Sequence, residues 1–206
     1  MTKWTTSKGT SICQVLGCSN PLLISKGSNS IMIDTGRSRN WSSISSKLDK
    51  LLYEKSLKAL ILTHTHHDHI ENFINLKEKY KAKTVVHKSE AGVLCNNDFD
   101  DGYILVDEKY DLNIFGIDGY ILHTPGHSAG SISIVIDNEI AIIGDAIGGM
   151  KKKPIMKKIK RVSEETITSW KELVHLKCSF YIPAHSEALE YHSLMELYKD
   201  YLHDGS

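Results

Sequence analysis

A cluster of histidines directly behind an apolar run is the feature that most constrains this chain. The run KALILTH has the length and continuity of a buried strand, and His64–His69 then holds four histidines and one aspartate in six positions. Side chains two residues apart in an extended segment point the same way, so His64 and His66 can reach one metal ion. Asp68 and His69 follow where the chain turns into the next helix and can face a neighbouring metal. Imidazoles with a carboxylate favour zinc, iron or manganese over calcium.

The composition limits the class of protein. The chain has 206 residues, of which 41% are hydrophobic, and we expect residues 1–206 to form a single domain. Basic and acidic residues number 25 each, which gives no sign of a polyanionic partner such as nucleic acid. Its four cysteines form no CxxC pair, which argues against a disulfide framework or a thiolate zinc site. With no secretory pattern and no apolar run of the ~20 residues that a membrane span needs, we expect a cytoplasmic protein without a membrane partner.

Apolar periodicity predicts alternating strands and helices along the chain. Short strands separated by turn residues come first, and helices are predicted over 40–55 and 70–80. The segment 103–143 is rich in strand patterns, among them LNIFGI at 112–117. Ser163 is the expected N-cap of a further helix, which precedes a strand at CSFYIPAH and a last amphipathic helix. The pattern predicts an α/β fold with helices on the outer faces of mixed strands.

Five short motifs resemble those of the metallo-β-lactamase-fold superfamily and occur in the order found there. They are IMIDTG with Asp34, the His64–His69 cluster, HTPGHSAGS with His127, AIIGDA with Asp145 and YIPAHSE with His185. The resemblance implies a four-layer αββα sandwich of two mixed β-sheets flanked by helices. It also implies metal ions at the edge between the two sheets.

The same resemblance implies a set of ligands for two divalent metal ions, expected to be zinc, although iron or manganese would also suit it. One ion is assigned to His64, His66 and His127, the second to Asp68, His69 and His185, with Asp145 as the bridge. Asp68 and Asp145 are expected to be the catalytic residues. We expect Asp34 to orient a ligand imidazole by a hydrogen bond, unless it forms only an Asx-turn. Since every ligand place is filled, His67 and His123 are expected to be structural or supporting residues.

A dinuclear metal-dependent hydrolase is the function that the resemblance implies, with a metal-bridging hydroxide attacking a small acyl substrate. Asp145 stands where the β-lactamases themselves usually carry Cys or Ser, and Gly148 stands where the lactonases often carry Tyr. The chain looks most like glyoxalase II, which implies a thioester substrate, with an ester or a lactone next in order. A phosphodiesterase or nuclease stays open as a second function, and a di-iron redox module that works with a partner protein as a third.

A basic segment follows Asp145. GGMKKKPIMKKIKR holds seven basic residues and no acidic one, from Lys151 to Arg161. One interpretation is a cationic rim beside the metals that attracts an anionic small-molecule substrate. The second interpretation, which we favour because most charge runs are of this kind, is a solvated loop.

Overall fold

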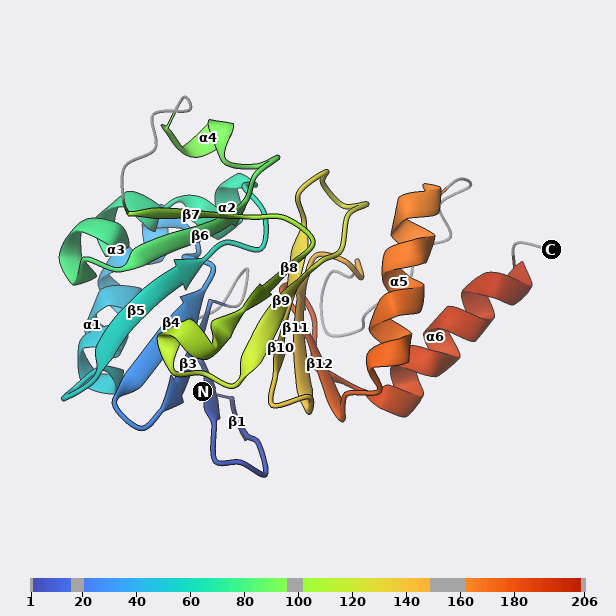
Figure 1. Ribbon diagram of the computed structural model, residues 1–206, viewed down its shortest axis with the longest axis horizontal. Helices are drawn as coiled ribbons and strands as arrows, with labels where there is room; N and C mark the ends of the chain where they lie inside the picture. The colour runs from blue at the N-terminus through green and yellow to red at the C-terminus, as the bar shows by residue number, and fades with distance from the viewer. Residues whose placement is uncertain (1, 16–20, 96–101, 149–161, 205–206) are drawn as a thin grey trace.

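Two β-sheets pack face to face, and helices cover the outer face of each sheet (Figure 1). The computed structural model describes residues 2–15, 21–95, 102–148 and 162–204. Both sheets contain parallel and antiparallel strand pairs. The predicted sandwich of two mixed sheets flanked by helices is therefore confirmed.

The first sheet has seven strands in the order β1-β2-β3-β4-β5-β6-β7. They are β1 (Lys3–Thr5), β2 (Ser11–Gln14), β3 (Leu22–Lys26), β4 (Asn29–Ile33), β5 (Ser56–Ile61), β6 (Lys83–His87) and β7 (Tyr103–Val106). Strands β1 to β4 pair antiparallel, whereas β4 to β7 run parallel. The carboxyl ends of β4 to β7 therefore meet at one edge, which is where open α/β sheets present their functional loops.

The second sheet has six strands in the order β13-β12-β11-β10-β9-β8. They are β8 (Lys109–Asp111), β9 (Gly119–His123), β10 (Ile132–Ile136), β11 (Ile140–Gly144), β12 (Phe180–Pro183) and β13 (Leu189–Glu190). Only β11 and β12 pair parallel; the other neighbours are antiparallel. The carboxyl ends of β11 and β12 consequently point toward the same edge of this sheet.

The helices pack through apolar stripes. They are α1 (Trp41–Leu51), α2 (His67–Ile70), α3 (Phe73–Tyr80), α4 (Gly92–Cys95), α5 (Glu164–Leu176) and α6 (Tyr191–Asp204), with 3₁₀ helices η1 (Ser38–Asn40) and η2 (Leu112–Phe115). Ile44 and Leu48 of α1 are four residues apart and both fully buried, because that spacing puts them on one helix face. The hydroxyl of Ser163 accepts the backbone N–H of Thr166 at 3.2 Å, so the predicted cap of α5 is confirmed.

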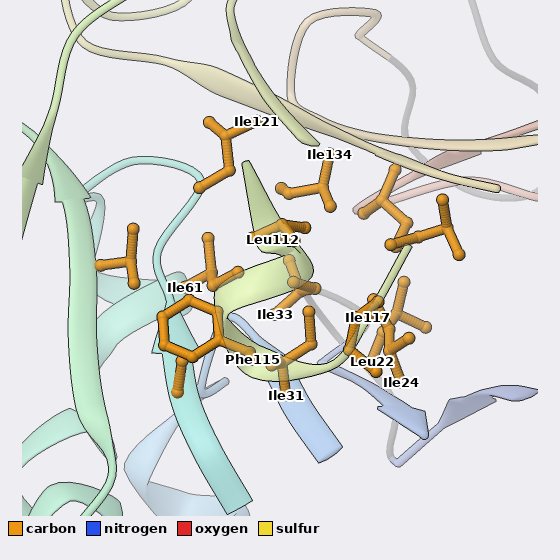
Figure 2. Close-up of a cluster of buried hydrophobic side chains, with 14 of the residues drawn as sticks. Leu22, Ile24, Ile31, Ile33, Ile61, Leu112, Phe115, Ile117, Ile121 and Ile134 are labelled. Atoms are coloured by element: carbon orange, nitrogen blue, oxygen red, sulfur yellow. The ribbon is translucent and has the colours of Figure 1, made fainter. Parts of the chain in front are cut away.

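An apolar core fills the space between the sheets. Figure 2 shows Ile121 and Ile134 of the second sheet facing Ile33 and Ile61 of the first, with Leu112 of η2 between them. Each of these side chains is at most 1% exposed. Burying a side chain of this size contributes about 1.5–3 kcal/mol, so the cluster holds the two sheets in fixed relation. The loops at their common edge are thereby fixed as well.

The predicted helix over 70–80 is interrupted. The structure has α2 up to Ile70 and a separate α3 from Phe73. Buried Asn72 lies at the break, and its side-chain amide donates to the backbone carbonyls of residues 35–37 at 2.9, 3.1 and 2.9 Å. These long-range hydrogen bonds favour a turn over the local helical preference. Similarly, the helix predicted over 40–55 ends at Leu51.

The strand predicted for LNIFGI is wrong, because the segment forms η2. The side chain of Asp111 accepts the backbone N–H of Asn113 at 2.9 Å and begins the helical turn. Gly116, at φ +74°, ends the turn in the left-handed region. The three-residue turn of a 3₁₀ helix buries Leu112 and Phe115 together, which an extended strand would not do.

Candidate metal centre

Four loops bring the predicted ligands together at one edge of the sandwich. The loop after β5 and the start of α2 carry His64–His69, the β9–β10 loop carries His127, and Asp145 and His185 follow β11 and β12. The seven predicted ligands form three overlapping groups with donor atoms within 4.8 Å: His64 with His66 and His127, His64 with His69 and Asp145, and Asp68 with His69 and His185. We call the first the three-histidine group and the last the Asp68 group. In Figure 1 the edge lies near α2.

The three-histidine group (His64, His66, His127) consists of closely spaced imidazoles. Nδ1 of His66 lies 3.0 Å from Nε2 of His64 and 2.9 Å from Nε2 of His127. His64 is 1% exposed, and its burial lowers its pKa to about 4. Burial likewise lowers the pKa of His127. Both imidazoles are therefore neutral at pH 7, the form in which histidine binds a metal.

The Asp68 group (Asp68, His69, His185) includes its own carboxylate. Asp68 Oδ2 lies 3.3 Å from His185 Nε2, and Asp68 Oδ1 lies 4.0 Å from His69 Nε2. Burial by itself lowers the pKa of His69, but the carboxylates of Asp34 and Asp145 outweigh it and raise that pKa above its usual value. A hydrogen bond with Asp145 raises the pKa of His185. The imidazoles of this group therefore hold protons more tightly than those of the three-histidine group.

Asp145 lies between the two groups. Its Oδ2 is 3.4 Å from Nε2 of His127 and 3.3 Å from Nε2 of His185. On its other side, Oδ1 is 3.7 Å from Nε2 of His69. Burial would raise the pKa of Asp145, but the hydrogen bond with His185 and the neighbouring imidazoles outweigh it and hold this pKa at about 2. A carboxylate that is ionised at neutral pH thus faces both groups.

Two buried atoms at the centre of this arrangement fit a bound cation. Among the residues that the structure describes, His69 Nε2 and Asp145 Oδ1 have no hydrogen-bond partner, although both atoms are buried; they lie 3.7 Å apart. An unsatisfied buried polar group costs about 1–3 kcal/mol, and a metal ion between the two atoms would satisfy both. Imidazole nitrogens with two carboxylates suit zinc, iron or manganese. The residues present therefore fit a metal centre.

A family model described as the metallo-beta-lactamase superfamily matches residues 17–185. The chain belongs to this superfamily. The matched range includes every residue of the three-histidine group and the Asp68 group, as well as Asp145. The superfamily is metal-dependent, which agrees with the chemistry of the donor atoms.

The curated relatives are named either as probable metallo-hydrolases or as hydroxyacylglutathione hydrolases. A probable metallo-hydrolase of Streptococcus pyogenes is 33% identical over 137 residues, which are 57% of this chain and 56% of that protein. A hydroxyacylglutathione hydrolase of Actinobacillus pleuropneumoniae is 29% identical over 92 residues, which are 45% of this chain and 36% of that protein. The chain thus spans about half the length, or less, of these two relatives.

Solved structures of the superfamily share the fold. An archaeal metallo-beta-lactamase superfamily protein of Sulfolobus tokodaii superposes with a TM-score of 0.68 at 25% identity, covering 90% of this chain and 80% of that one. A metallo beta-lactamase of Hirschia baltica superposes with a TM-score of 0.71 at 17% identity, covering 96% of each chain. The second likeness concerns the fold alone, because the identity is low.

Asp34, in the superfamily's first motif, makes the hydrogen bond predicted for it. The N–H at Nδ1 of His69 donates to Asp34 Oδ2 at 2.8 Å, which leaves Nε2 of His69 directed at the site. The same carboxylate accepts the backbone N–H and the hydroxyl of Thr63, each at 2.8 Å. Asp34 is 3% exposed, so it holds His69 from inside the protein. The carboxylate of Asp34 therefore binds His69 and Thr63 and does not serve only to form an Asx-turn.

Arg37 is a site residue that the sequence patterns did not indicate. Its Nη2 lies 3.6 Å from Oδ2 of Asp68, and its side chain is 41% exposed. The one available signal is that Arg37 directly follows the Asp-Thr-Gly turn that begins with Asp34. The positive charge of Arg37 therefore lies beside the Asp68 group.

The remaining predictions concern residues around the centre. His67 is exposed at the start of α2, and His123 stacks on His87 with ring centroids 4.0 Å apart; neither His67 nor His123 belongs to the three groups. The basic segment from Lys151 to Arg161 lies outside the described residues. Among the residues that the structure does describe, no helix combines the length and apolar character needed to cross a membrane.

Proposed function

We propose that this protein is a hydrolase that uses two divalent metal ions to cleave a small acyl substrate, a thioester in the first place. The observation that carries the proposal is the cluster of five histidines and two aspartates whose donor atoms lie within 4.8 Å in three overlapping groups. The three-histidine group would hold one ion, the Asp68 group the other, and Asp145 would contact both. When bound, such ions make water a nucleophile at neutral pH and polarise the oxygen of the bond to be cleaved.

The two aspartates have different roles in the proposed reaction. Asp145, whose pKa of about 2 keeps it ionised, fixes the separation of the two groups and does not exchange protons at neutral pH. Asp68 has a side chain that is 19% exposed and so can meet the substrate. We propose that Asp68 takes the proton of the attacking water and returns it to the leaving group.

A thioester is the favoured substrate for two reasons. The similarity to a hydroxyacylglutathione hydrolase, 29% over 92 residues, supports an acyl group carried on sulfur. Moreover, Asp145 stands where the β-lactamases usually carry Cys or Ser, which argues against a lactam substrate. Esters and lactones share the acyl chemistry and are the next candidates.

We also propose that residues 1–206 work as one domain in a reducing compartment such as the cytoplasm. Ligands from both sheets support the first point, since His64–His69 follows β5 and Asp145 follows β11. Free, buried thiols at Cys13 and Cys178 support the second.

Metal reconstitution with a substrate panel tests the proposal. Protein stripped with a chelator should be inactive, and zinc, iron(II) or manganese(II) should restore hydrolysis of thioesters before esters, lactones or phosphodiesters. The variant Asp68→Asn should weaken metal binding by the Asp68 group and lose most of the activity. Preferred cleavage of phosphodiesters would favour a nuclease instead, and a coloured di-iron centre that exchanges electrons without hydrolysis would favour a redox module. Either result would overturn the acyl-hydrolase proposal.

A further inference from the structure

Glu90 is a buried carboxylate beside the metal centre that belongs to none of the three groups of ligands. It lies just after β6, in the turn that leads into α4, and is 8% exposed. The sequence offers no signal for it, since SEAGVL carries only a short helical pattern. A buried carboxylate must be paired or hydrogen-bonded, so its partners indicate its role.

The hydrogen-bond partners of Glu90 lie in the two segments that carry the three-histidine group. Oε2 accepts the backbone N–H of Thr65 at 3.1 Å, and the Thr65 hydroxyl donates to the same oxygen. Thr65 stands between His64 and His66, so its side chain points away from the metal centre while theirs point into it. One carboxylate oxygen thereby holds the segment that carries both histidines.

The other side of Glu90 holds the loop with His127. Oε1 accepts the backbone N–H of Gly130 at 3.1 Å, and the side chain of Ser128 donates a further hydrogen bond. Packing here is so close that a Cβ at Gly130 would lie 2.5 Å from Cγ of Glu90 and 2.8 Å from Nδ1 of His87. Only glycine allows the loop to approach Glu90 in this way.

The hydrogen bonds are strong enough to keep Glu90 charged inside the protein. Burial raises the pKa of Glu90, but the hydrogen bonds from Ser128, Thr65 and Gly130 outweigh burial and leave this pKa below its usual value. An ionised acceptor makes stronger hydrogen bonds than a neutral one. Glutamine in its place would turn an N–H donor toward one of the two backbone N–H groups and lose that contact.

We propose that Glu90 is a positioning residue that sets the spacing of His64, His66 and His127 and so controls the metal affinity of the three-histidine group. The inference rests on the proposed metal centre and goes beyond it. Asp34 supports the neighbouring Asp68 group through His69, whereas Glu90 contacts no residue of that group among its hydrogen-bond partners. The two buried carboxylates therefore make their closest contacts in different groups, although Asp34 also accepts the hydroxyl of Thr63, which lies 3.1 Å from Nδ1 of His64.

Metal titration of paired variants tests this role without using catalysis. In a His185→Ala background, where only the three-histidine group is complete, Glu90→Gln should raise the dissociation constant for cobalt(II) or zinc about 10–100-fold. In a His127→Ala background, where only the Asp68 group is complete, the same substitution should change it by no more than about twofold. Calorimetry gives the constants, and the visible bands of bound cobalt report the geometry of each site.

Two further variants separate positioning from general stability. Asp137→Asn alters a carboxylate that is 4% exposed at the other end of β10, and it should lower the thermal midpoint without changing metal affinity. Thr65→Val removes only the hydroxyl donor to Glu90 and should weaken the three-histidine group by a smaller factor than Glu90→Gln. If Glu90→Gln weakens both groups equally or neither, the positioning role is wrong. A wild-type protein that binds no metal would instead refute the proposed metal centre.

Discussion

The three-histidine group and the Asp68 group adjoin each other, yet their surroundings differ in charge. In the first, imidazole nitrogens lie 2.9 to 3.0 Å apart with no carboxylate of the group's own, and burial lowers the pKa of His64 and His127. In the second, a carboxylate is part of the group, Arg37 lies 3.6 Å from it, and the pKa values of His69 and His185 are raised.

This difference indicates how each group behaves without metal. Neutral imidazoles are ready to bind a cation. The histidines of the Asp68 group hold protons more tightly, and a metal must displace any proton that they carry. The residues that hold the two groups in place also differ. Glu90 accepts backbone N–H groups beside the three-histidine group, and Asp34 binds the imidazole of His69 in the Asp68 group. We therefore expect the two groups to respond separately to pH and to substitution.

Removing the residue that faces both groups should have the largest effect. Asp145→Ala should lower kcat/KM by more than about 100-fold, beyond the 10–100-fold typical of residues that only support a ligand. It should also weaken the metal affinity of both groups, because Asp145 contacts His127, His185 and His69. The fold should be kept, since the side chain lies at a strand end outside the core, and circular dichroism checks this. Wild-type activity in the variant would refute the shared carboxylate.

Substituting Asp34 should weaken metal binding mainly at the Asp68 group, whereas substituting Glu90 should weaken it at the three-histidine group. Asp34→Asn should raise the metal dissociation constant of the Asp68 group about 10–100-fold, because His69 loses its acceptor. Stability should fall by about 1–3 kcal/mol if a donor of His69 or Thr63 is left unpaired. Titration in the His127→Ala and His185→Ala backgrounds assigns the effect to a group. An equal effect on both groups would contradict the separate supports.

Lowering the pH should remove metal first from the Asp68 group and then from the three-histidine group. We expect this effect to be smaller than those of the two substitutions. The pKa values of His69 and His185 are raised, so these imidazoles gain protons at a higher pH than His64, whose pKa is about 4. Between about pH 7 and pH 5 the Asp68 group should lose its ion before the three-histidine group does. Metal content and cobalt spectra after dialysis measure the order. Simultaneous loss would show that the groups are not distinct.

The loops that carry the predicted ligands could be found from the sequence because their signals are local. His64–His69 sits directly behind an apolar strand pattern, and Asp34, His127 and Asp145 each follow another strand pattern in the order of known motifs. Strand ends at one edge of a sandwich then bring the motifs together. The family and the two-sheet fold follow from the same short segments.

Contacts between distant segments were not predictable. Glu90 meets Thr65 across 25 positions and Gly130 across 40, and no periodicity marks it. Asn72 interrupts a helical pattern by bonding to residues 35–37, and η2 replaces a predicted strand because Leu112 and Phe115 pack together between the sheets. In each case the free energy of a long-range contact outweighed a local preference.

Metal stoichiometry tests the central claim, a pair of ions held by two adjoining groups, most directly. Elemental analysis of native or reconstituted protein should find about two ions per chain, and about one in each of His127→Ala and His185→Ala. The two single-site variants should give different cobalt spectra, because their remaining groups differ in donor atoms. One ion or none in the reconstituted wild-type protein, or loss of both ions from either variant, would contradict the claim.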